Sequence, residues 1–125
     1  MISADSSSLI AYLQGESGGD IDLIERAIID GELVFAPPVI TELRAGAVPN
    51  DELETLLTQT PRLVLDDGLW DRAGRNRRLL IEKGLKARFA DAVIAQCCVD
   101  ADVALIARDR DYRHFERWCG LKLAA

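Results

Sequence analysis

The chain has 125 residues, of which 49% are hydrophobic and 29% charged, and its formal net charge is −6. This length fits one domain over residues 1–125 with a single sizeable core, and the composition excludes a disordered chain. No apolar run reaches the roughly 18 residues that a membrane helix needs, so no membrane partner is expected. The first residues lack the basic leader of a secretory signal, which predicts a cytoplasmic protein.

Short apolar segments alternate with helical patterns along the chain. In chain order, the patterns predict a strand at 1–5, helices at 6–16 and 20–31, a strand at 33–36, helices at 37–46 and 50–60, a strand at 62–65, helices at 67–84 and 88–101, a strand at 103–107, a helix at 111–119 and a strand at 121–124. This alternation predicts an α/β fold, a three-layer α/β/α sandwich around a central parallel sheet. The sequence has no glycine-rich phosphate loop, which argues against a nucleotide cofactor.

Four acidic residues are expected at one edge of this sheet. Ligands of parallel α/β sheets bind beyond the carboxyl ends of the strands, and Asp5 and Asp109 follow the first and fourth strands. Glu42 lies on the helix after the second strand, and Asp91 lies near the start of the helix before the fourth. The topology therefore predicts that these four carboxylates converge.

Asp91 is unusual because its surroundings in the stretch ARFADAVIAQCC are almost wholly apolar. A buried ionised carboxylate costs several kcal/mol unless a charge or hydrogen bonds compensate it. A salt bridge to Arg88 is one such compensation, and a cation shared with other acids is another.

Converging carboxylates imply a bound cation. At an effective dielectric constant near 20, two like charges about 4 Å apart repel by roughly 4 kcal/mol, so an uncompensated cluster would take up protons or destabilise the fold. Oxygen ligands without histidine or cysteine favour Mg²⁺ or Mn²⁺, and Ca²⁺ is disfavoured because the chain has no EF-hand loop. Such an ion supports phosphodiester hydrolysis.

The acids lie in four stretches, ISADSSSLIAYL, VITELRAG, ARFADAVIAQCC and LIARDRDYRHF. In their order and spacing these stretches resemble the motifs of PIN-domain nucleases, particularly the VapC-type toxins of bacterial type II toxin–antitoxin systems, and the resemblance covers essentially the whole chain. It implies a PIN-like fold and a Mg²⁺- or Mn²⁺-dependent endoribonuclease that acts on structured RNA such as tRNA. It also implies a homodimer and inhibition by a small antitoxin protein.

The resemblance also implies roles for individual residues. The metal-binding and catalytic acids of the family fall on Asp5, Glu42, Asp91 and Asp109, with Asp111 as a candidate contributor. The hydroxyl group that follows the first acid by two positions falls on Ser7.

The sequence departs from the family at Ala107, where a small hydroxyl residue often precedes the fourth acid by two positions. We therefore expect that Asp109 lacks one supporting hydrogen bond. This departure leaves an alternative function open, a catalytically impaired PIN-like module that binds RNA or protein.

The acidic net charge argues against RNA binding unless acid and base are separated on the surface. Basic residues are concentrated in residues 71–88, where they could form either a solvated helix face or a surface that attracts polyanions. The candidates for contact with RNA phosphates or with an acidic antitoxin tail are Arg72, Arg75, Arg77 and Arg78.

Plainer interpretations remain open for several of these residues. Asp5 could cap the helix that follows it, Glu42 could pair with an arginine on an exposed helix face, and either Asp109 or Asp111 could be a helix cap. His114 is expected to be a partly exposed structural residue. A phospho-acceptor receiver domain also has acids at strand ends, but the acid at position 91 has no place in that scheme.

Overall fold

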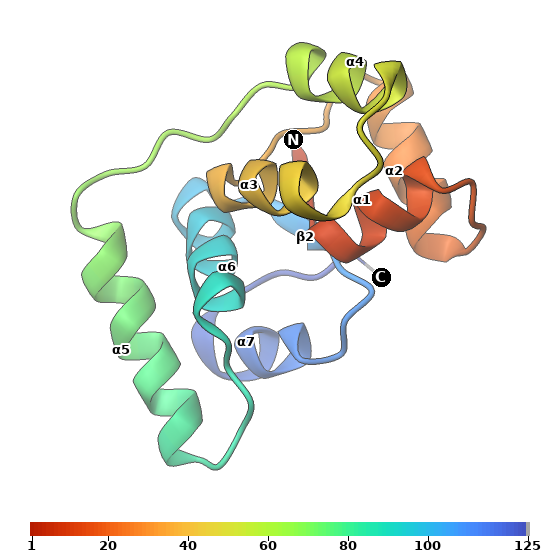
Figure 1. The fold of residues 1–125 in the computed structure, drawn as a ribbon. Coiled ribbons are helices and arrows are strands. Elements are labelled where there is room, and N and C mark those ends of the chain that lie inside the picture. Colours follow the sequence, from red (N-terminus) through yellow and green to blue (C-terminus); the bar gives the residue numbers. More distant parts are fainter. Residues whose placement is uncertain (125) are drawn as a thin grey trace.

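The computed structural model describes residues 1–124. The helices are α1 (Ser6–Leu13), α2 (Gly19–Ile29), α3 (Pro37–Gly46), α4 (Asp51–Gln59), α5 (Leu69–Glu82), α6 (Phe89–Ala101) and α7 (Tyr112–Cys119), as shown in Figure 1. The two regular strands are β1 (Ile2–Ala4) and β2 (Ala104–Ile106). The order of elements agrees with the alternation predicted from the sequence.

The strands are parallel, and β1 pairs with β2 so that Ile2 lies opposite Ala104. Three of the five predicted strands, residues 33–36, 62–65 and 121–124, contribute only isolated parallel bridges. These bridges are Ile2 to Leu33, Phe35 to Arg62 and Leu105 to Leu123. The predicted parallel α/β architecture is therefore confirmed, although three of its strands are shorter than expected.

Prolines explain part of this shortening. Pro37 begins α3 directly after Ala36, and Pro61, which has no N–H to donate, precedes the bridge at Arg62. The segments still exchange two backbone hydrogen bonds, from Phe35 N to Pro61 O and from Leu63 N to Phe35 O, both at 2.8 Å.

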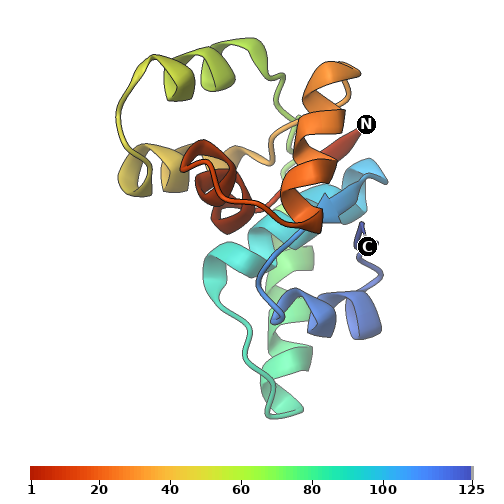
Figure 2. The same ribbon diagram turned by 90° about the vertical axis from the view of Figure 1, so that its right-hand side faces the viewer.

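Helix α6 runs through the middle of the molecule and packs against α3, α5, α7 and β2. Residues 91–98 of α6 are all buried, and all but Asp91 and Gln96 are apolar, so the helix turns apolar residues to most sides. Figures 1 and 2 show α1–α4 gathered in one half of the molecule and α5–α7 in the other. Within residues 1–124, none of the helices is both long and apolar enough to cross a membrane.

Candidate active site

A cavity of about 330 Å³ opens at the carboxyl ends of β1 and β2, where acidic residues gather. Asp5 follows β1 directly, and Asp109 follows β2 on the loop that leads to α7. The backbone N–H of Asp5 donates to Ile106 O at 2.8 Å, which joins the ends of the two strands. The cavity is lined by Asp5, Ser6, Ser7, Ile10, Glu42, Arg88, Ala90, Asp91 and Asp109. All four acids that the sequence placed at this edge therefore share one cavity.

Asp5 stands at the N-cap position of α1, but its side chain makes no capping hydrogen bond. The side chain is buried, and its Oδ2 accepts a hydrogen bond from Ser7 Oγ at 2.6 Å. Capping thus does not explain Asp5. Ser7 is the hydroxyl residue that the sequence resemblance placed beside this acid.

Glu42 reaches the cavity from α3 and is half-buried. Its Oε1 accepts a hydrogen bond from Ser6 Oγ at 3.0 Å. Burial, followed by the charges of Asp5 and Asp91, raises the pKa of Glu42 above its ordinary value, although the bond from Ser6 opposes this shift. Arg44, the arginine near it on α3, pairs instead with Glu54, so an exposed ion pair does not explain Glu42.

Asp91 lies in the first turn of α6 and is only 6% exposed. Its Oδ2 accepts a hydrogen bond from Arg88 Nε at 3.1 Å, so the salt bridge considered from the sequence is present. Burial is the main reason why the pKa of Asp91 is nevertheless raised, and the nearby charge of Asp5 adds to it. The ion pair therefore compensates the buried charge only in part.

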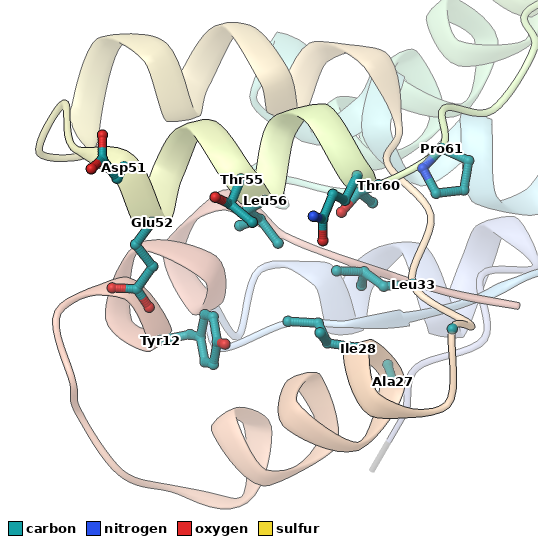
Figure 3. Close-up of a pocket in the computed structure, with 12 residues that line it drawn as sticks. Tyr12, Ala27, Ile28, Leu33, Asp51, Glu52, Thr55, Leu56, Thr60 and Pro61 are labelled. Carbon is teal, nitrogen blue, oxygen red and sulfur yellow. The ribbon is translucent and has the colours of Figure 1, made fainter.

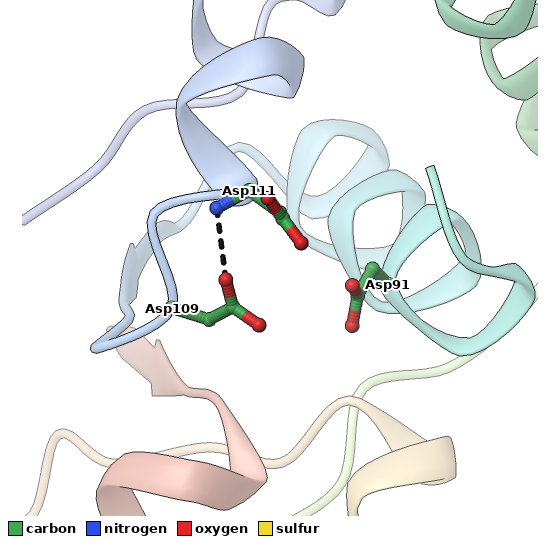
Figure 4. A group of neighbouring side chains, drawn as sticks. All are labelled: Asp91, Asp109 and Asp111. Atoms are coloured by element: carbon green, nitrogen blue, oxygen red, sulfur yellow. Dashed lines mark hydrogen bonds between the residues drawn. The ribbon is translucent and has the colours of Figure 1, made fainter. Parts of the chain in front are cut away.

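Asp109 and Asp111 project from the loop before α7 toward Asp91, as Figure 4 shows. One carboxylate oxygen from each of the three residues lies within 4.8 Å of the others. The backbone N–H of Asp111 donates to Asp109 Oδ1 at 2.9 Å, which fixes the shape of the loop. Asp109 lines the cavity, whereas Asp111 stands at the N-cap position of α7 and faces Lys86 Nζ at 3.7 Å.

Arg88 lies among the acids and carries the positive charge of the cavity lining. Besides its bond to Asp91, a second nitrogen of its guanidinium contacts Asp109. The charge of Asp91, and more weakly that of Asp109, raises the pKa of Arg88. The arginine thus occupies a place where the carboxylates attract a cation.

Tyr112 is a residue of the site that the sequence analysis missed. Its Oη lies 2.9 Å from Asp5 Oδ1 and 3.2 Å from Asp91 Oδ1, so one hydroxyl joins two of the acids. The sequence placed Tyr112 only within the last helix. A buried tyrosine usually finds a hydrogen-bond partner, but the sequence does not show which one.

The four arginines singled out from the sequence all lie on α5, outside the carboxylate cavity. Arg72 pairs with both Asp66 and Asp100, Arg77 Nε donates to Ala87 O at 2.8 Å, and Arg78 pairs with Glu82. Arg75 is exposed on the same helix. Their positive charges are thus compensated to different degrees, and that of Arg72 most fully.

A second groove of about 430 Å³ lies between α1, α2 and α4 (Figure 3). Its floor is apolar, with Ile28, Leu33 and Leu56, and Asp51 and Glu52 stand at one end. The four acids of the carboxylate cavity do not line it. This groove is therefore separate from the candidate active site.

The carboxylate cavity offers a suitable set of ligand atoms for a hard divalent cation. The polar side chains that line it present carboxylate and hydroxyl oxygens, apart from the guanidinium of Arg88. Oxygen-only ligands of this kind favour Mg²⁺ and Mn²⁺ over softer metals. Asp91, Asp109 and Asp111 bring one carboxylate oxygen each within 4.8 Å of the others, so the residues fit such an ion.

A comparison with protein-family models identifies the architecture. The model of the PIN domain matches residues 2–117, which is nearly the whole chain. The chain belongs to the PIN-domain family. PIN domains are in general nucleases, and the acidic cavity of this PIN domain agrees with that activity. No curated protein sequence gives a significant match.

Solved structures that resemble this PIN domain include VapBC proteins, and VapBC-5 from Mycobacterium tuberculosis is described as a member of the VapBC family of toxin–antitoxin systems. VapBC2 from Rickettsia felis, bound to a DNA fragment from its promoter, matches with a TM-score of 0.76 and 17% identity over 99% of this chain and 98% of that chain. DNA-bound VapBC from Salmonella typhimurium matches with a TM-score of 0.71 and 20% identity over 99% and 98%. FitAcB from Neisseria gonorrhoeae matches with a TM-score of 0.69 and 15% identity over 100% and 97%. At these identities the similarity shows a common fold.

Proposed function

We propose that this PIN domain is a Mg²⁺- or Mn²⁺-dependent endoribonuclease and the toxin of a type II toxin–antitoxin system. The observation that carries the proposal is the convergence of Asp5, Glu42, Asp91 and Asp109 in one cavity at the edge of the parallel sheet. The four acids come from separate elements of the fold, so they are not simply neighbours on one surface helix.

The acids divide the work of the site. Asp5, Asp91 and Asp109 would hold the cation, and Glu42 would either be a fourth ligand or hold a water molecule beside the cation. A bound Mg²⁺ or Mn²⁺ supplies a Lewis acid that lowers the pKa of water and offsets negative charge on a phosphodiester. Ser7 donates a hydrogen bond to Asp5 Oδ2, and the raised pKa of Glu42 suits a carboxylate that accepts a proton from water.

Asp109 is better placed than Asp111 to be a ligand. Both carry an oxygen close to Asp91, but Asp109 lines the cavity that also contains Asp5 and Glu42. Asp111 supports Asp109 through its backbone N–H. We therefore assign the ligand role to Asp109 and a supporting role to Asp111.

The proposal extends to substrate and partners. Arg75, Arg77 and Arg78 on α5 are the groups available to attract RNA phosphates, with tRNA as a candidate substrate, and Arg72 contributes less because two carboxylates hold it. An antitoxin protein is the proposed partner, because VapBC complexes share this fold. We further propose that the protein is located in the cytoplasm and forms a homodimer.

Substitution of one buried ligand tests the function. In the full-length protein, Asp91→Asn should abolish cleavage of a tRNA pool in Mg²⁺ or Mn²⁺ and relieve growth arrest in cells that express the chain. Asp67→Asn, an exposed change in the loop before α5, is the matched control and should cleave like the wild type. EDTA should stop the wild-type reaction. Cleavage by Asp91→Asn at the wild-type rate would overturn the proposal.

A binding module without cleavage is the alternative function. Two observations favour it: Arg88 already neutralises part of the carboxylate cluster, and Ala107 offers no side-chain hydroxyl near Asp109. A protein of this kind would bind RNA or a protein partner but show neither divalent-ion binding by calorimetry nor cleavage in any metal.

A further inference from the structure

Tyr112 lies behind the carboxylate cavity, on the side of the protein core. It is the first residue of α7, is fully buried, and packs against Phe115 with the ring centroids 6.2 Å apart. The cavity is lined by the acids and not by the tyrosine, so the hydroxyl group reaches the carboxylates from within the protein. Close packing around the ring fixes the position of Oη.

Asp5 and Asp91 each turn one oxygen toward Tyr112. These Oδ1 atoms lie 2.9 and 3.2 Å from Tyr112 Oη. The Oδ2 atoms face other donors, namely Ser7 Oγ at 2.6 Å from Asp5 and Arg88 Nε at 3.1 Å from Asp91. The two carboxylates are therefore held in the same way, with one oxygen toward the core and one toward the cavity.

The donors on the two sides differ in mobility. Ser7 and Arg88 are exposed and line the cavity, so an incoming ligand can displace them. The phenol is buried and cannot be displaced from the cavity side. A neutral tyrosine carries one O–H donor, so the hydroxyl can donate to the carboxylates from the core side.

The hydroxyl has one proton, so its contacts with Asp5 Oδ1 and Asp91 Oδ1 share a single donor. The shared donor links the two acids without cancelling their negative charge. That charge remains available on the Oδ2 atoms, which is what a cation entering the cavity requires. A phenylalanine ring would pack in the core in the same way. Packing therefore does not require the hydroxyl, whose contacts are with Asp5 and Asp91.

We propose that Tyr112 is a positioning residue that holds Asp5 and Asp91 with their Oδ2 oxygens directed toward the cavity, where a divalent cation binds. This role rests on the metal-dependent function proposed above. Tyr112 does not touch the substrate or the ion, and it acts through the two carboxylates.

The sequence contains two tyrosines, which provides a matched pair of variants. Tyr112→Phe removes the bridging hydroxyl, and Tyr12→Phe removes a hydroxyl from α1 at the separate groove in Figure 3. Binding of Mn²⁺ alone is measured by isothermal titration calorimetry on the metal-free full-length proteins. Loss of a group that orients metal ligands typically weakens affinity 10- to 100-fold, so Tyr112→Phe should raise the Kd for Mn²⁺ about tenfold or more. Tyr12→Phe should leave it unchanged.

The outcomes separate this role from the proposed function. Wild-type Mn²⁺ affinity in a folded Tyr112→Phe protein would overturn the positioning role and leave the nuclease proposal standing. No Mn²⁺ binding by the wild type would overturn both. Equal weakening in both variants would also overturn the role, because it would show a general effect of losing a hydroxyl.

A second measurement does not depend on the folding of Tyr112→Phe. The wild-type chain and Tyr12→Phe are labelled with 3-fluorotyrosine, so that the resonance missing from the variant identifies Tyr12 in a ¹⁹F NMR spectrum. Titration with diamagnetic Mg²⁺ should shift the Tyr112 signal and leave the Tyr12 signal in place. A Tyr112 signal that does not move at saturating Mg²⁺ would overturn the proposal.

Discussion

Arg88 and Asp91 form an ion pair across the first turn of α6, with Arg88 Nε 3.1 Å from Asp91 Oδ2. The same guanidinium contacts Asp109, so one positive charge lies between two acids of the cavity. The side chain of Arg88 is 54% exposed and can swing away without disturbing the core. Arg88 is thus an internal counter-ion of the metal-free cluster, in competition with any other cation.

Arg88→Gln should therefore strengthen metal binding while weakening the metal-free fold. Without the guanidinium, the repulsion among the carboxylates is less compensated, and the metal-free Tm should fall by a few degrees. The increase in Tm on adding Mn²⁺ should become larger than in the wild type, because the ion no longer displaces an arginine. Differential scanning fluorimetry with and without millimolar Mn²⁺ measures both changes. Arg75→Gln is the control, and a smaller Mn²⁺-dependent gain in Arg88→Gln would show that Arg88 assists the ion.

Asp91→Asn should remove activity and yet stabilise the metal-free protein. Because the pKa of Asp91 is raised in the folded chain, its ionised form is disfavoured there, and a neutral side chain of the same shape should raise Tm. The wild type should gain free energy of unfolding as the pH falls through this raised pKa, and the variant should lack this gain from residue 91. Thermal unfolding between about pH 7 and pH 4 in EDTA measures the difference. A variant less stable than the wild type at every pH would show that the Arg88 pair outweighs burial.

The parts of the site that the sequence could predict depend on topology. In a parallel sheet the carboxyl ends of the strands meet, so an acid after β1 and another after β2 must lie at one edge. Asp91 could be included because a carboxylate in an apolar helix needs compensation. Both arguments use only chain order and hydrophobic pattern, which can be read directly from the sequence.

Side-chain contacts could not be predicted in the same way. Tyr112 joins Asp5 and Asp91 only because α7 packs under both, and nothing in the local pattern distinguishes it from an ordinary core aromatic. The second contact of Arg88, with Asp109, likewise depends on how two distant segments meet. Two of the three strands reduced to single bridges lie next to prolines, Pro37 and Pro61, which limit pairings that hydrophobic pattern alone would allow.

Asp20→Asn should lower stability near neutral pH and have little effect in strong acid. Arg108 donates to both oxygens of Asp20, at 2.8 and 3.1 Å, and the pKa of Asp20 is lowered mainly by this bonding. A lowered pKa contributes stability above the ordinary value for aspartate, and that stability is lost as the pH falls through the lowered value. The Tm values of the variant and the wild type, measured from about pH 7 to pH 2, should therefore converge at low pH.

Asp22→Asn, in the same first turn of α2, is the control. A difference in Tm that persists unchanged at pH 2 would point to lost packing and not to charge.

Arginine substitutions on α5 should separate RNA contact from structural pairing. Each Lys or Arg that neutralises a phosphate contributes close to one unit to the dependence of log affinity on log salt concentration. Arg75→Gln and Arg78→Gln should therefore weaken binding of catalytically inactive Asp91→Asn protein to tRNA and reduce that slope by about one unit each. Arg72→Gln should change RNA binding little, because Asp66 and Asp100 already hold the guanidinium, and it should instead lower Tm. Fluorescence anisotropy over a series of KCl concentrations makes this comparison.

Two results would contradict the prediction. If Arg72→Gln reduced the slope of log affinity against log salt concentration the most, RNA would displace both carboxylates from Arg72. If the slope were unchanged in all three variants, RNA would bind elsewhere on the surface.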